Sequence, residues 1–248
     1  MKQPCTRVMI TGAAGAIGAE VARAFADAGT RVIAIDRDGK SLEQLMSTLG
    51  GDGHQMVAAD LAATDVDDLV QSAAEAMGGM DALVHVAAVL VRRDTIFDIT
   101  DEDLELQIGI NFTTTFRLNR AAARVMIDSG SGGSIVNFVS QGWWTGGFGG
   151  SVIYNASKGA IVTMTRGLAR TLAPHNIRVN AVSPGMVDTP MLRTGLSDQG
   201  LQDLVSATPM KRLAAPSEMT GAAVFLTSEQ ASFITGSVIN VSGGFLMY

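Results

Sequence analysis

The chain has 248 residues, of which 47% are hydrophobic and 17% are charged, so it can bury a sizeable core and is not a disordered protein. Its net charge is −6 and its longest basic run is Arg92-Arg93, which argues against a nucleic-acid partner. A strand-like run begins at Arg7 and no apolar run approaches about 20 residues, so we expect a cytoplasmic protein without a signal peptide or membrane helix. The lone Cys5 permits no internal disulfide and predicts no metal site.

The pattern along the chain alternates short β-branched runs with longer alanine-rich runs. Each β-branched run is almost continuously apolar, which is typical of strands buried on both faces of a parallel sheet. The expected strands are residues 7–11, 31–35, 54–58, 82–86, 134–139, 178–182 and 238–241. The expected helices are residues 15–28, 40–49, 65–77, 101–127, 151–172 and 216–226. The sequence therefore predicts an α/β fold: a doubly wound, Rossmann-type parallel sheet of about seven strands, flanked by helices, in a single domain over residues 1–248.

Two segments interrupt this alternation. Residues 141–150 are glycine-rich and carry both tryptophans, and residues 186–211 are polar, contain methionines and have weak helical character. Long connections in compact folds are often lids or binding loops. We therefore expect both segments to contact the substrate.

A glycine-rich turn follows the first expected strand and opens the first expected helix. Glycine permits a tight turn and a close approach of backbone to phosphate, and the helix N-terminus offers free N–H groups and the positive end of its dipole. Such a turn at the start of an α/β chain predicts the pyrophosphate site of a dinucleotide. The expected contacts are Gly12, Ala14, Gly15, Ala16, Ile17 and Gly18.

Acidic residues follow the second and third expected strands. Asp36 lies 24 residues after Gly12, where a carboxylate can bind both hydroxyls of the adenosine ribose and repel the extra phosphate of NADP. Arg37 can partly offset this repulsion, so NAD is favoured over NADP; taken alone, Asp36 would be a solvated strand-end acid. After the third strand come Asp60 and Leu61, where Asp60 either contacts the adenine edge or caps the helix that begins near residue 65.

Tyr154 and Lys158 are four residues apart in an expected helix, so they share one face. A nearby ammonium and a cationic nicotinamide ring would lower the phenol pKa from about 10, and the pair could then run acid–base chemistry. On spacing alone, an ordinary helical pair is the better interpretation. Ser140 changes that balance, because it ends the fifth strand at the ligand edge of the sheet and can hold a substrate oxygen. Asn111 lies inside an expected helix, where Asn needs a local reason such as a bend or a bound water.

The order and spacing of these motifs resemble the short-chain dehydrogenase/reductase family, in its single-domain branch. The resemblance covers nearly all 248 residues. It rests on TGxxx(A/G)xG at residues 11–18 and YxxxK at residues 154–158, together with Asp36, Asp60, Asn111, Ser140, Pro184-Gly185, Thr189 and Ile234-Thr235-Gly236.

The resemblance implies a role for each matched residue. Tyr154 would be the acid/base, Ser140 would orient and polarise the substrate oxygen, and Lys158 would hold the nicotinamide ribose and lower the pKa of Tyr154. Asn111 would keep a water in a proton relay. The other implied contacts to the cofactor are Ala87, Ala88, Pro184, Gly185, Val187 and Thr189. Members of this branch are commonly homotetramers, so we expect one here.

The chain departs from the family where the fourth strand ends. The family's Asn-Asn-Ala-Gly is replaced by His85-Val86-Ala87-Ala88. Val86 cannot make the side-chain hydrogen bonds with which the second Asn braces the sheet, Ala88 adds a methyl group beside the cofactor ribose, and His85 is expected to bond the backbone. We expect these changes to affect cofactor affinity more than chemistry.

Three further features bear on the substrate. Trp143 and Trp144 follow Ser140 closely, and they either wall the substrate pocket or pack on a neighbouring subunit. Arg92 either grips an anionic substrate group, since guanidinium suits a carboxylate, or is a solvated surface residue. The apolar tail at residues 245–248 is expected to pack at a subunit interface.

The sequence thus predicts an oxidoreductase that binds NAD(H) and interconverts a secondary alcohol and a ketone by hydride transfer, with Tyr154 as the acid/base. One alternative is a 3-oxoacyl-thioester reductase that uses NADPH, against which Asp36 and the net charge of −6 argue. Another is a non-catalytic module that senses redox state by binding the cofactor, which would have no need of Ser140, Tyr154 and Lys158.

Overall fold

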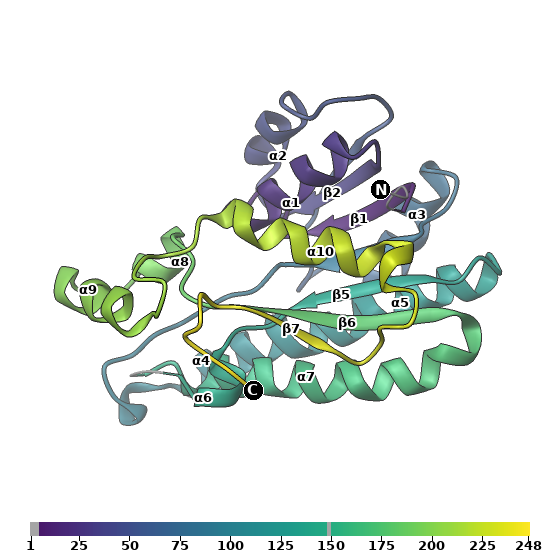
Figure 1. The fold of residues 1–248 in the computed structure, drawn as a ribbon. Coiled ribbons are helices and arrows are strands. Elements are labelled where there is room, and N and C mark those ends of the chain that lie inside the picture. The colour runs from purple at the N-terminus through teal and green to yellow at the C-terminus, as the bar shows by residue number, and fades with distance from the viewer. Residues whose placement is uncertain (1–4, 148–149) are drawn as a thin grey trace.

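The computed structural model describes residues 5–147 and 150–248. Within these residues, seven strands form one parallel sheet in the order β3-β2-β1-β4-β5-β6-β7 (Figure 1). The strands are β1 (Arg7–Thr11), β2 (Arg31–Asp36), β3 (Gln55–Ala58), β4 (Ala82–His85), β5 (Gly133–Phe138), β6 (Ile177–Pro184) and β7 (Val238–Val241). The strand order reverses between β1 and β4, so the predicted doubly wound sheet is confirmed.

Helices cover both faces of this sheet, as the apolar runs of its strands require. Neighbouring strand residues alternate between two cores, with Ile10 and Val84 in one and Met9 and Leu83 in the other. The first core is covered by α1 (Ala16–Asp27), α2 (Gly39–Met46) and α10 (Thr220–Thr227), and the second by α3 (Val66–Ala76), α5 (Thr114–Asp128) and α7 (Val152–Leu172). Figure 1 shows α10 in front of the sheet and α5 behind it.

Shorter helices lie in the connections. They are α4 (Asp101–Ile108), α6 (Gly142–Thr145), α8 (Pro190–Arg193), α9 (Asp198–Ala207) and the 3-10 turns Ile96–Asp98, Ala173–His175, Pro216–Met219 and Glu229–Ala231. The glycine-rich segment forms α6, with residues 148 and 149 outside the described residues, and the segment 186–211 forms α8 and α9. These three helices lie at one end of the molecule (Figure 1), where the strands reach their carboxyl ends. Across the described ranges, no helix is long and apolar enough to cross a membrane.

The predicted helix over residues 101–127 is helical throughout, but it is not a regular α-helix. The sequence predicts a continuous helix over residues 101–127, but the chain forms α4, then a π-helical turn at Gly109–Thr113, then α5. A π turn spans one residue more than an α-helical turn. We attribute the interruption to Asn111, whose buried side chain bonds the backbone of Val89. The sequence signal was the Asn itself, for which a bend was one of the expected reasons.

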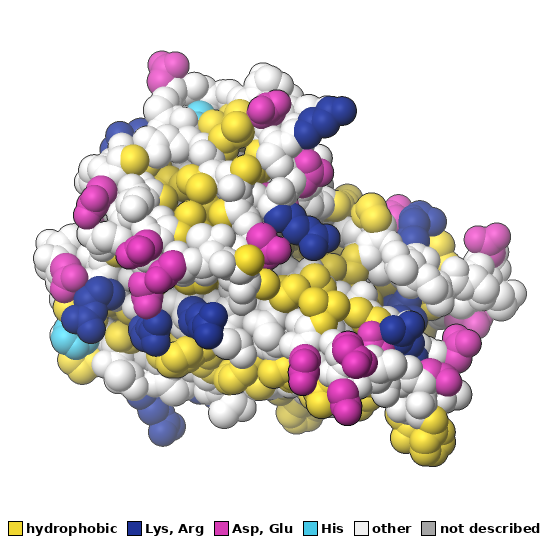
Figure 2. All heavy atoms as spheres, turned by 180° about the vertical axis from the view of Figure 1, so that it is seen from behind, with side chains coloured by type: hydrophobic (Ala, Val, Ile, Leu, Met, Phe, Trp, Pro, Cys, Tyr) yellow, Lys and Arg dark blue, Asp and Glu magenta, His cyan; other side chains and the backbone are white. Residues whose placement is uncertain are grey.

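The surface mixes charges of both signs. On the face in Figure 2, Lys and Arg side chains lie among Asp and Glu side chains, and hydrophobic side chains are exposed between them. The charges on this face are therefore interspersed rather than gathered into a patch of one sign.

A pair of buried amides ties α5 to β5. Asn119 Nδ2 donates to Asn137 Oδ1 at 2.9 Å, and Asn137 Nδ2 donates back to Asn119 Oδ1 at 3.0 Å. Asn137 also donates to Thr165 Oγ1 on α7 at 3.3 Å. Asn119 and Asn137 are fully buried, and the amide oxygen of each accepts from the other, while Asn119 Nδ2 also donates to Thr115 O at 2.8 Å. The pair fixes the helix beside the strand that leads into the site described below.

We predict that Asn137→Ala lowers the free energy of unfolding by about 2–3 kcal/mol, because the amide oxygen of Asn119 is then buried without its donor. The double variant with Asn119→Ala should lose less than the sum of the two single losses, since both members of the pair are then removed. Urea denaturation of the wild type and three variants measures this cycle. Strictly additive losses would contradict the pairing.

Candidate active site

The carboxyl edge of the sheet borders a cavity of about 710 Å³. The turn after β1 and the residues that follow β2 and β3 line one end of it, and the residues that follow β5, the helix α7 and the lid segment 186–211 line the other. Most of the residues predicted to bind cofactor lie on this wall: Gly12, Gly15, Ala16, Ile17, Gly18, Asp36, Arg37, Asp60, Leu61, Ala87, Ala88, Tyr154, Lys158, Pro184, Gly185, Val187 and Thr189. The structure thus brings segments far apart in the sequence to one chamber.

The turn between β1 and α1 has room for backbone only. Gly12 has a φ of +71°, and a Cβ atom there would lie 2.6 Å from the backbone nitrogen of Ala87. Gly15 precedes α1 as its N-cap, and in the described structure no side chain caps this helix. The uncapped N–H groups therefore remain available to an anion at the cavity wall, which fits the pyrophosphate of a dinucleotide.

Asp36 stands at the rim of the same end of the cavity. Its two oxygens accept from the backbone N–H of Ala14 at 3.0 Å and of Asp38 at 3.1 Å, which fixes the carboxylate beside the glycine turn. Ala14 itself is outside the cavity lining and acts through this bond. A fixed carboxylate at this place suits the two hydroxyls of a ribose.

The helix cap that was one alternative for Asp60 belongs to another residue. Asp65 caps α3 by accepting from the N–H groups of Asp67 and Asp68. Asp60 instead accepts from Ala62 N–H at 2.9 Å and lines the cavity. The structure therefore leaves the adenine edge as the remaining interpretation of Asp60.

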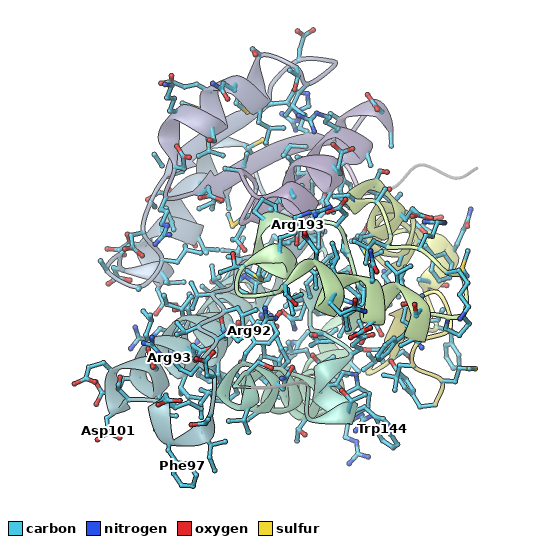
Figure 3. All side chains as sticks on the ribbon, turned by 90° about the vertical axis from the view of Figure 1, so that its left-hand side faces the viewer. Arg92, Arg93, Phe97, Asp101, Trp144 and Arg193 are labelled. Carbon is cyan, nitrogen blue, oxygen red and sulfur yellow. The ribbon has the colours of Figure 1, made fainter. Side chains whose placement is uncertain are left out.

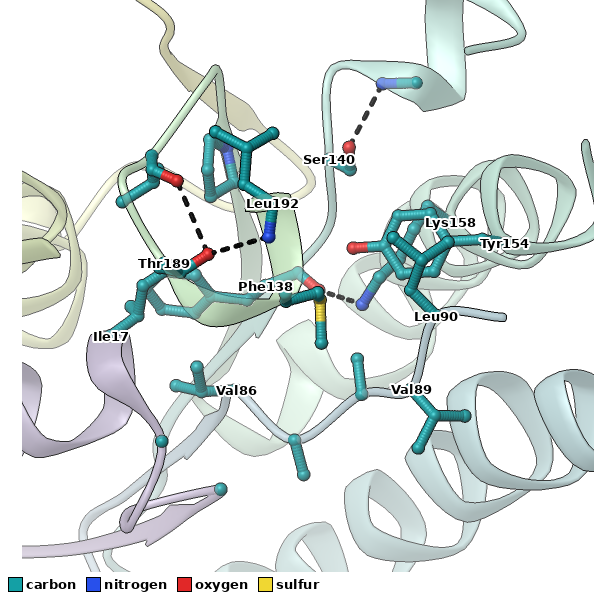
Figure 4. Close-up of a pocket in the computed structure, with 18 of the residues that line it drawn as sticks. Ile17, Val86, Val89, Leu90, Phe138, Ser140, Tyr154, Lys158, Thr189 and Leu192 are labelled. Carbon is teal, nitrogen blue, oxygen red and sulfur yellow. Dashed lines mark hydrogen bonds between the residues drawn. The ribbon is translucent and has the colours of Figure 1, made fainter. Parts of the chain in front are cut away.

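Ser140, Tyr154 and Lys158 meet at the opposite end of the cavity (Figure 4). Ser140 follows β5, and the other two lie one turn apart on α7. Lys158 is 2% exposed, its Nζ donates to Phe138 O at 2.9 Å, and it lies 5.5 Å from the centre of the Tyr154 ring. A phenol, an alcohol and an amine thus face one space, the set needed to move a proton at a substrate oxygen.

Burial dominates the acid–base properties of this end. It raises the pKa of Tyr154 to about 12, although the Ser140 hydroxyl acts in the lowering direction. It also lowers the pKa of Lys158 to about 7. In the protein alone the lysine therefore does not bring the pKa of the phenol down, contrary to the sequence expectation. Tyr154 holds its proton at neutral pH and can donate it.

Asn111 supports the site from behind. Its Oδ1 accepts from Val89 N–H at 2.8 Å, and its Nδ2 donates to Val89 O at 2.9 Å and to Ser157 Oγ at 3.2 Å. Asn111 is fully buried and outside the cavity lining, whereas Val89 lines it. The side chain therefore fixes a wall of the cavity, and its role toward a water remains a prediction.

His85 makes an unexpected network at the end of β4. It is 1% exposed, with Nδ1 at 2.6 Å from Thr11 Oγ1 and Nε2 at 2.8 Å from Thr115 Oγ1. The Thr115 hydroxyl donates its one proton to the backbone oxygen of Asn111, so it must accept from Nε2–H. Thr11 then donates to Nδ1, which assigns the neutral Nε2–H tautomer. The expectation of a bond to backbone is wrong, since both ring nitrogens bond hydroxyls.

The environment of His85 keeps it neutral. Burial, reinforced by the positive charge of Lys158, lowers the pKa of His85 to about 3. The ring is therefore uncharged over the whole range in which the protein would work. It links β1 to α5 through its two hydrogen bonds to threonine hydroxyls.

The structure places both tryptophans outside the cavity lining. The rings of Trp143 and Trp144 pack edge-on at 5.3 Å, and the Tyr248 ring lies 5.2 Å from Trp143 and 6.0 Å from Trp144. The apolar tail at residues 245–248 thus packs against its own chain, and Leu246 within the tail is buried. Figure 3 shows Trp144 at the outer surface, apart from Arg92, which does line the cavity.

Sequence reasoning missed the aliphatic part of the cavity. Its residues come from the segment after β4, the π turn and the lid segment: Val89, Leu90, Ile110, Met191, Leu192, Leu196 and Leu204. The available signal was the presence of large apolar residues in the otherwise polar lid segment. Their direction could not be read, because α8 and α9 are too short to show a clear period.

We predict that Lys158→Met stabilises the fold most below pH 7. The folded lysine loses its proton near its pKa of about 7, whereas the unfolded lysine keeps it to about 10.4. Between these values the unfolded chain binds more protons, so the wild type gains stability as pH rises and the advantage of Met shrinks. Urea unfolding at pH 6 and pH 9.5 measures it, with the exposed Lys40→Met as control. If the difference in unfolding free energy between Lys158→Met and the wild type is the same at both pH values, the lowered pKa of buried Lys158 is contradicted.

Comparison with known proteins agrees with this geometry. A family model described as enoyl-(acyl carrier protein) reductase matches residues 12–246. Galactitol 2-dehydrogenase (L-tagatose-forming) of Cereibacter sphaeroides is 33% identical, with 96% of this chain and 94% of that protein aligned. L-xylulose reductase of Bos taurus is 34% identical over 97% and 96% of the two chains, and a 3-oxoacyl-(acyl-carrier-protein) reductase of Thermotoga maritima is 34% identical over 96% and 97%.

Solved structures give the same result. A short chain dehydrogenase/reductase family protein superposes with a TM-score of 0.87 and 35% identity, covering 98% of both chains. A protein from Sinorhizobium meliloti, assigned as a short-chain alcohol dehydrogenase, gives a TM-score of 0.92 and 33% identity, covering 98% of this chain and 96% of that one. The chain therefore belongs to the short-chain dehydrogenase/reductase family and is an oxidoreductase that acts on alcohol or carbonyl groups.

Proposed function

We propose that the protein interconverts a secondary alcohol and a ketone with NAD(H), using Tyr154 as the acid/base. The observation that supports this most is the meeting of Ser140, Tyr154 and Lys158 in one cavity with the glycine turn and Asp36. The relatives include dehydrogenases named for galactitol and D-threitol, which are alcohols. Alcohol and ketone chemistry therefore agrees with both the geometry of the site and the names of these relatives.

The side chains divide the work at the substrate oxygen. When bound, the nicotinamide supplies or accepts the hydride. Tyr154 gives its proton to the oxygen of a ketone, or takes the proton of an alcohol, while the Ser140 hydroxyl holds the same oxygen in place. Lys158, which is held by Phe138 O beside the ring of Tyr154, would bind the nicotinamide ribose. Because burial raises the pKa of Tyr154 to about 12, the residue carries at neutral pH the proton that ketone reduction needs, and the rate of alcohol oxidation should increase with rising pH.

Two other functions share parts of this support. A 3-oxoacyl-thioester reductase with NADPH would fit the Thermotoga maritima relative and the name of the family model. The carboxylate of Asp36 at the cavity rim argues against NADPH, because it would repel the extra phosphate of that cofactor. A redox-sensing module without catalysis would fit the altered end of β4, and the assembled Ser140 and Tyr154 argue against it.

We infer that the protein acts in the cytoplasm as a homotetramer, as is common in this family. The structure offers apolar side chains that an assembly could cover, with Phe233 fully exposed and Phe97 91% exposed. Light scattering on the purified protein tests the size of the assembly.

We predict that Tyr154→Phe lowers turnover by at least about 100-fold, because the variant has no proton to exchange with the substrate oxygen. NADH affinity should change less than threefold, since the ring is kept. Galactitol, D-threitol and 2-octanol serve as test alcohols with NAD at pH 9. The matched control is Tyr248→Phe, which removes the other tyrosine hydroxyl, away from the cavity. Full activity in Tyr154→Phe would refute the assigned role.

Asp36→Asn should shift cofactor preference toward NADP(H). The change removes the negative charge that repels the extra phosphate but keeps the size and one acceptor oxygen. We expect the ratio of the NADPH to the NADH dissociation constant to fall at least about tenfold, since one like-charge contact is removed. Calorimetry on both proteins measures the ratio, with Asp60→Asn as the control carboxylate. An unchanged ratio in Asp36→Asn would count against NAD selection by this residue.

A further inference from the structure

The cavity beyond Ser140 and Tyr154 has an aliphatic wall. In Figure 4, Leu90 lies beside Tyr154, and Leu192 lies across the space from it. With the other aliphatic residues of the lid segment, they form a wall whose side chains cannot hydrogen-bond a substrate, although polar residues such as Gln141 and Asn155 line other parts of the cavity. A polyol bound against them would lose its hydration without replacement, whereas a hydrocarbon chain would gain from burial.

Three charged residues reach the lining near this wall, and two of them are accounted for. Arg93 is neutralised by Asp103, with guanidinium-to-carboxylate distances of 2.7 Å for both bonds. Asp94 is exposed to solvent. Arg92 is the third, and it is half-buried. Apart from Lys158, which lies beside Tyr154, the charge that bears on a ligand at this wall is therefore that of Arg92.

Arg92 has no counter-ion of its own. Among residues 5–147 and 150–248, no carboxylate forms an ion pair with it, and its Nη1 donates to the backbone oxygen of Thr194 in the lid segment. Figure 3 shows Arg92 between Arg93 and the lid helix that carries Arg193. Arg193 differs from it, because Asp188 pairs with Arg193 at 2.8 Å.

The energetics of this position favour an anionic ligand. Burial lowers the pKa of Arg92, and no carboxylate acts in the opposite direction. A guanidinium has five N–H donors in a fork that matches a carboxylate, and the bond to Thr194 uses one side of it. A partly desolvated and unpaired charge costs stability, and a bound anion would remove that cost.

We propose that the substrate is an alcohol or ketone with an aliphatic body and a carboxylate, and that Arg92 binds the carboxylate. The inference rests on the proposed function, because the reacting oxygen must lie at Ser140 and Tyr154. The hydrocarbon chain then runs along Leu90 and the lid segment to the guanidinium. A neutral polyol such as galactitol leaves both the aliphatic wall and Arg92 without a partner.

The test compares octanoate with octanamide, which has the same shape and no charge. Protein saturated with NADH is titrated with each compound at pH 7.5 by calorimetry. The variants are Arg92→Met and Arg92→Gln, which remove the charge, and Arg92→Lys, which keeps the charge but loses the fork. The matched control is Arg120→Met, which removes a surface cation on α5 that is paired with Asp67.

We expect the wild type and Arg120→Met to bind octanoate at least about tenfold tighter than octanamide, as for a charge-assisted bidentate contact. This ratio should fall to near one in Arg92→Met and Arg92→Gln and be intermediate in Arg92→Lys. A ratio near one in the wild type overturns the inference. A ratio unchanged in Arg92→Met also overturns it, because the anion is then held elsewhere, for example at Lys158. Binding of neither compound overturns it too, since the aliphatic wall is part of the inference.

The same experiment separates the two levels of the argument. If NADH does not bind, the proposed function fails, and the octanoate comparison on the protein alone still decides the role of Arg92. If NADH binds and Tyr154→Phe abolishes turnover while octanoate shows no preference, the function stands and the acidic substrate is excluded.

Discussion

The glycine turn after β1 and the residues that follow β4 touch backbone to backbone, and the site depends on this contact. Gly12 can approach Ala87 only because it has no Cβ and adopts a positive φ. The two strands are neighbours at the point where the strand order reverses, so the chain leaves β1 and β4 toward opposite faces of the sheet. The space that opens between the two exits is the cavity. A side chain at Gly12 would separate its two walls.

A second set of contacts connects the end of β1 to the cavity wall near Ser140 and Tyr154. The uncharged ring of His85 links Thr11 at the end of β1 to Thr115 on α5, and Thr115 holds the backbone of Asn111. Asn111 in turn holds Val89 on the cavity wall. The bonds of His85 join buried groups, where water competes little, and the bonds of Asn111 to Val89 are partly buried. The histidine therefore braces β1 against α5 with two side-chain bonds, next to Val86, which stands where the family has its bracing asparagine.

The sequence predicted the sheet and the glycine turn that lines the cavity because both rest on local patterns. Apolar runs mark buried strands, and a glycine turn between strand and helix marks a phosphate site. The failures involve residues whose state is set by distant partners. Asn111 interrupts its helix for Val89, His85 bonds two threonines, and burial sets the pKa of Tyr154. Proximity to Ser140 along the chain suggests a pocket wall as one of two alternatives for the tryptophans, whereas their rings lie outside the cavity lining and contact Tyr248. Tertiary contacts of this kind leave no periodic trace.

The π turn at Gly109–Thr113 has a consequence for the helix that follows it. Each residue of an α-helix turns the chain by about 100°, so an extra residue in one turn rotates everything after it. The orientation that lets Asn119 meet Asn137 therefore includes the extra residue. Loss of one residue here would leave a more regular helix whose polar and apolar faces point the wrong way. At this turn, the number of residues sets which face of α5 meets the sheet, whereas the identity of most of these residues does not.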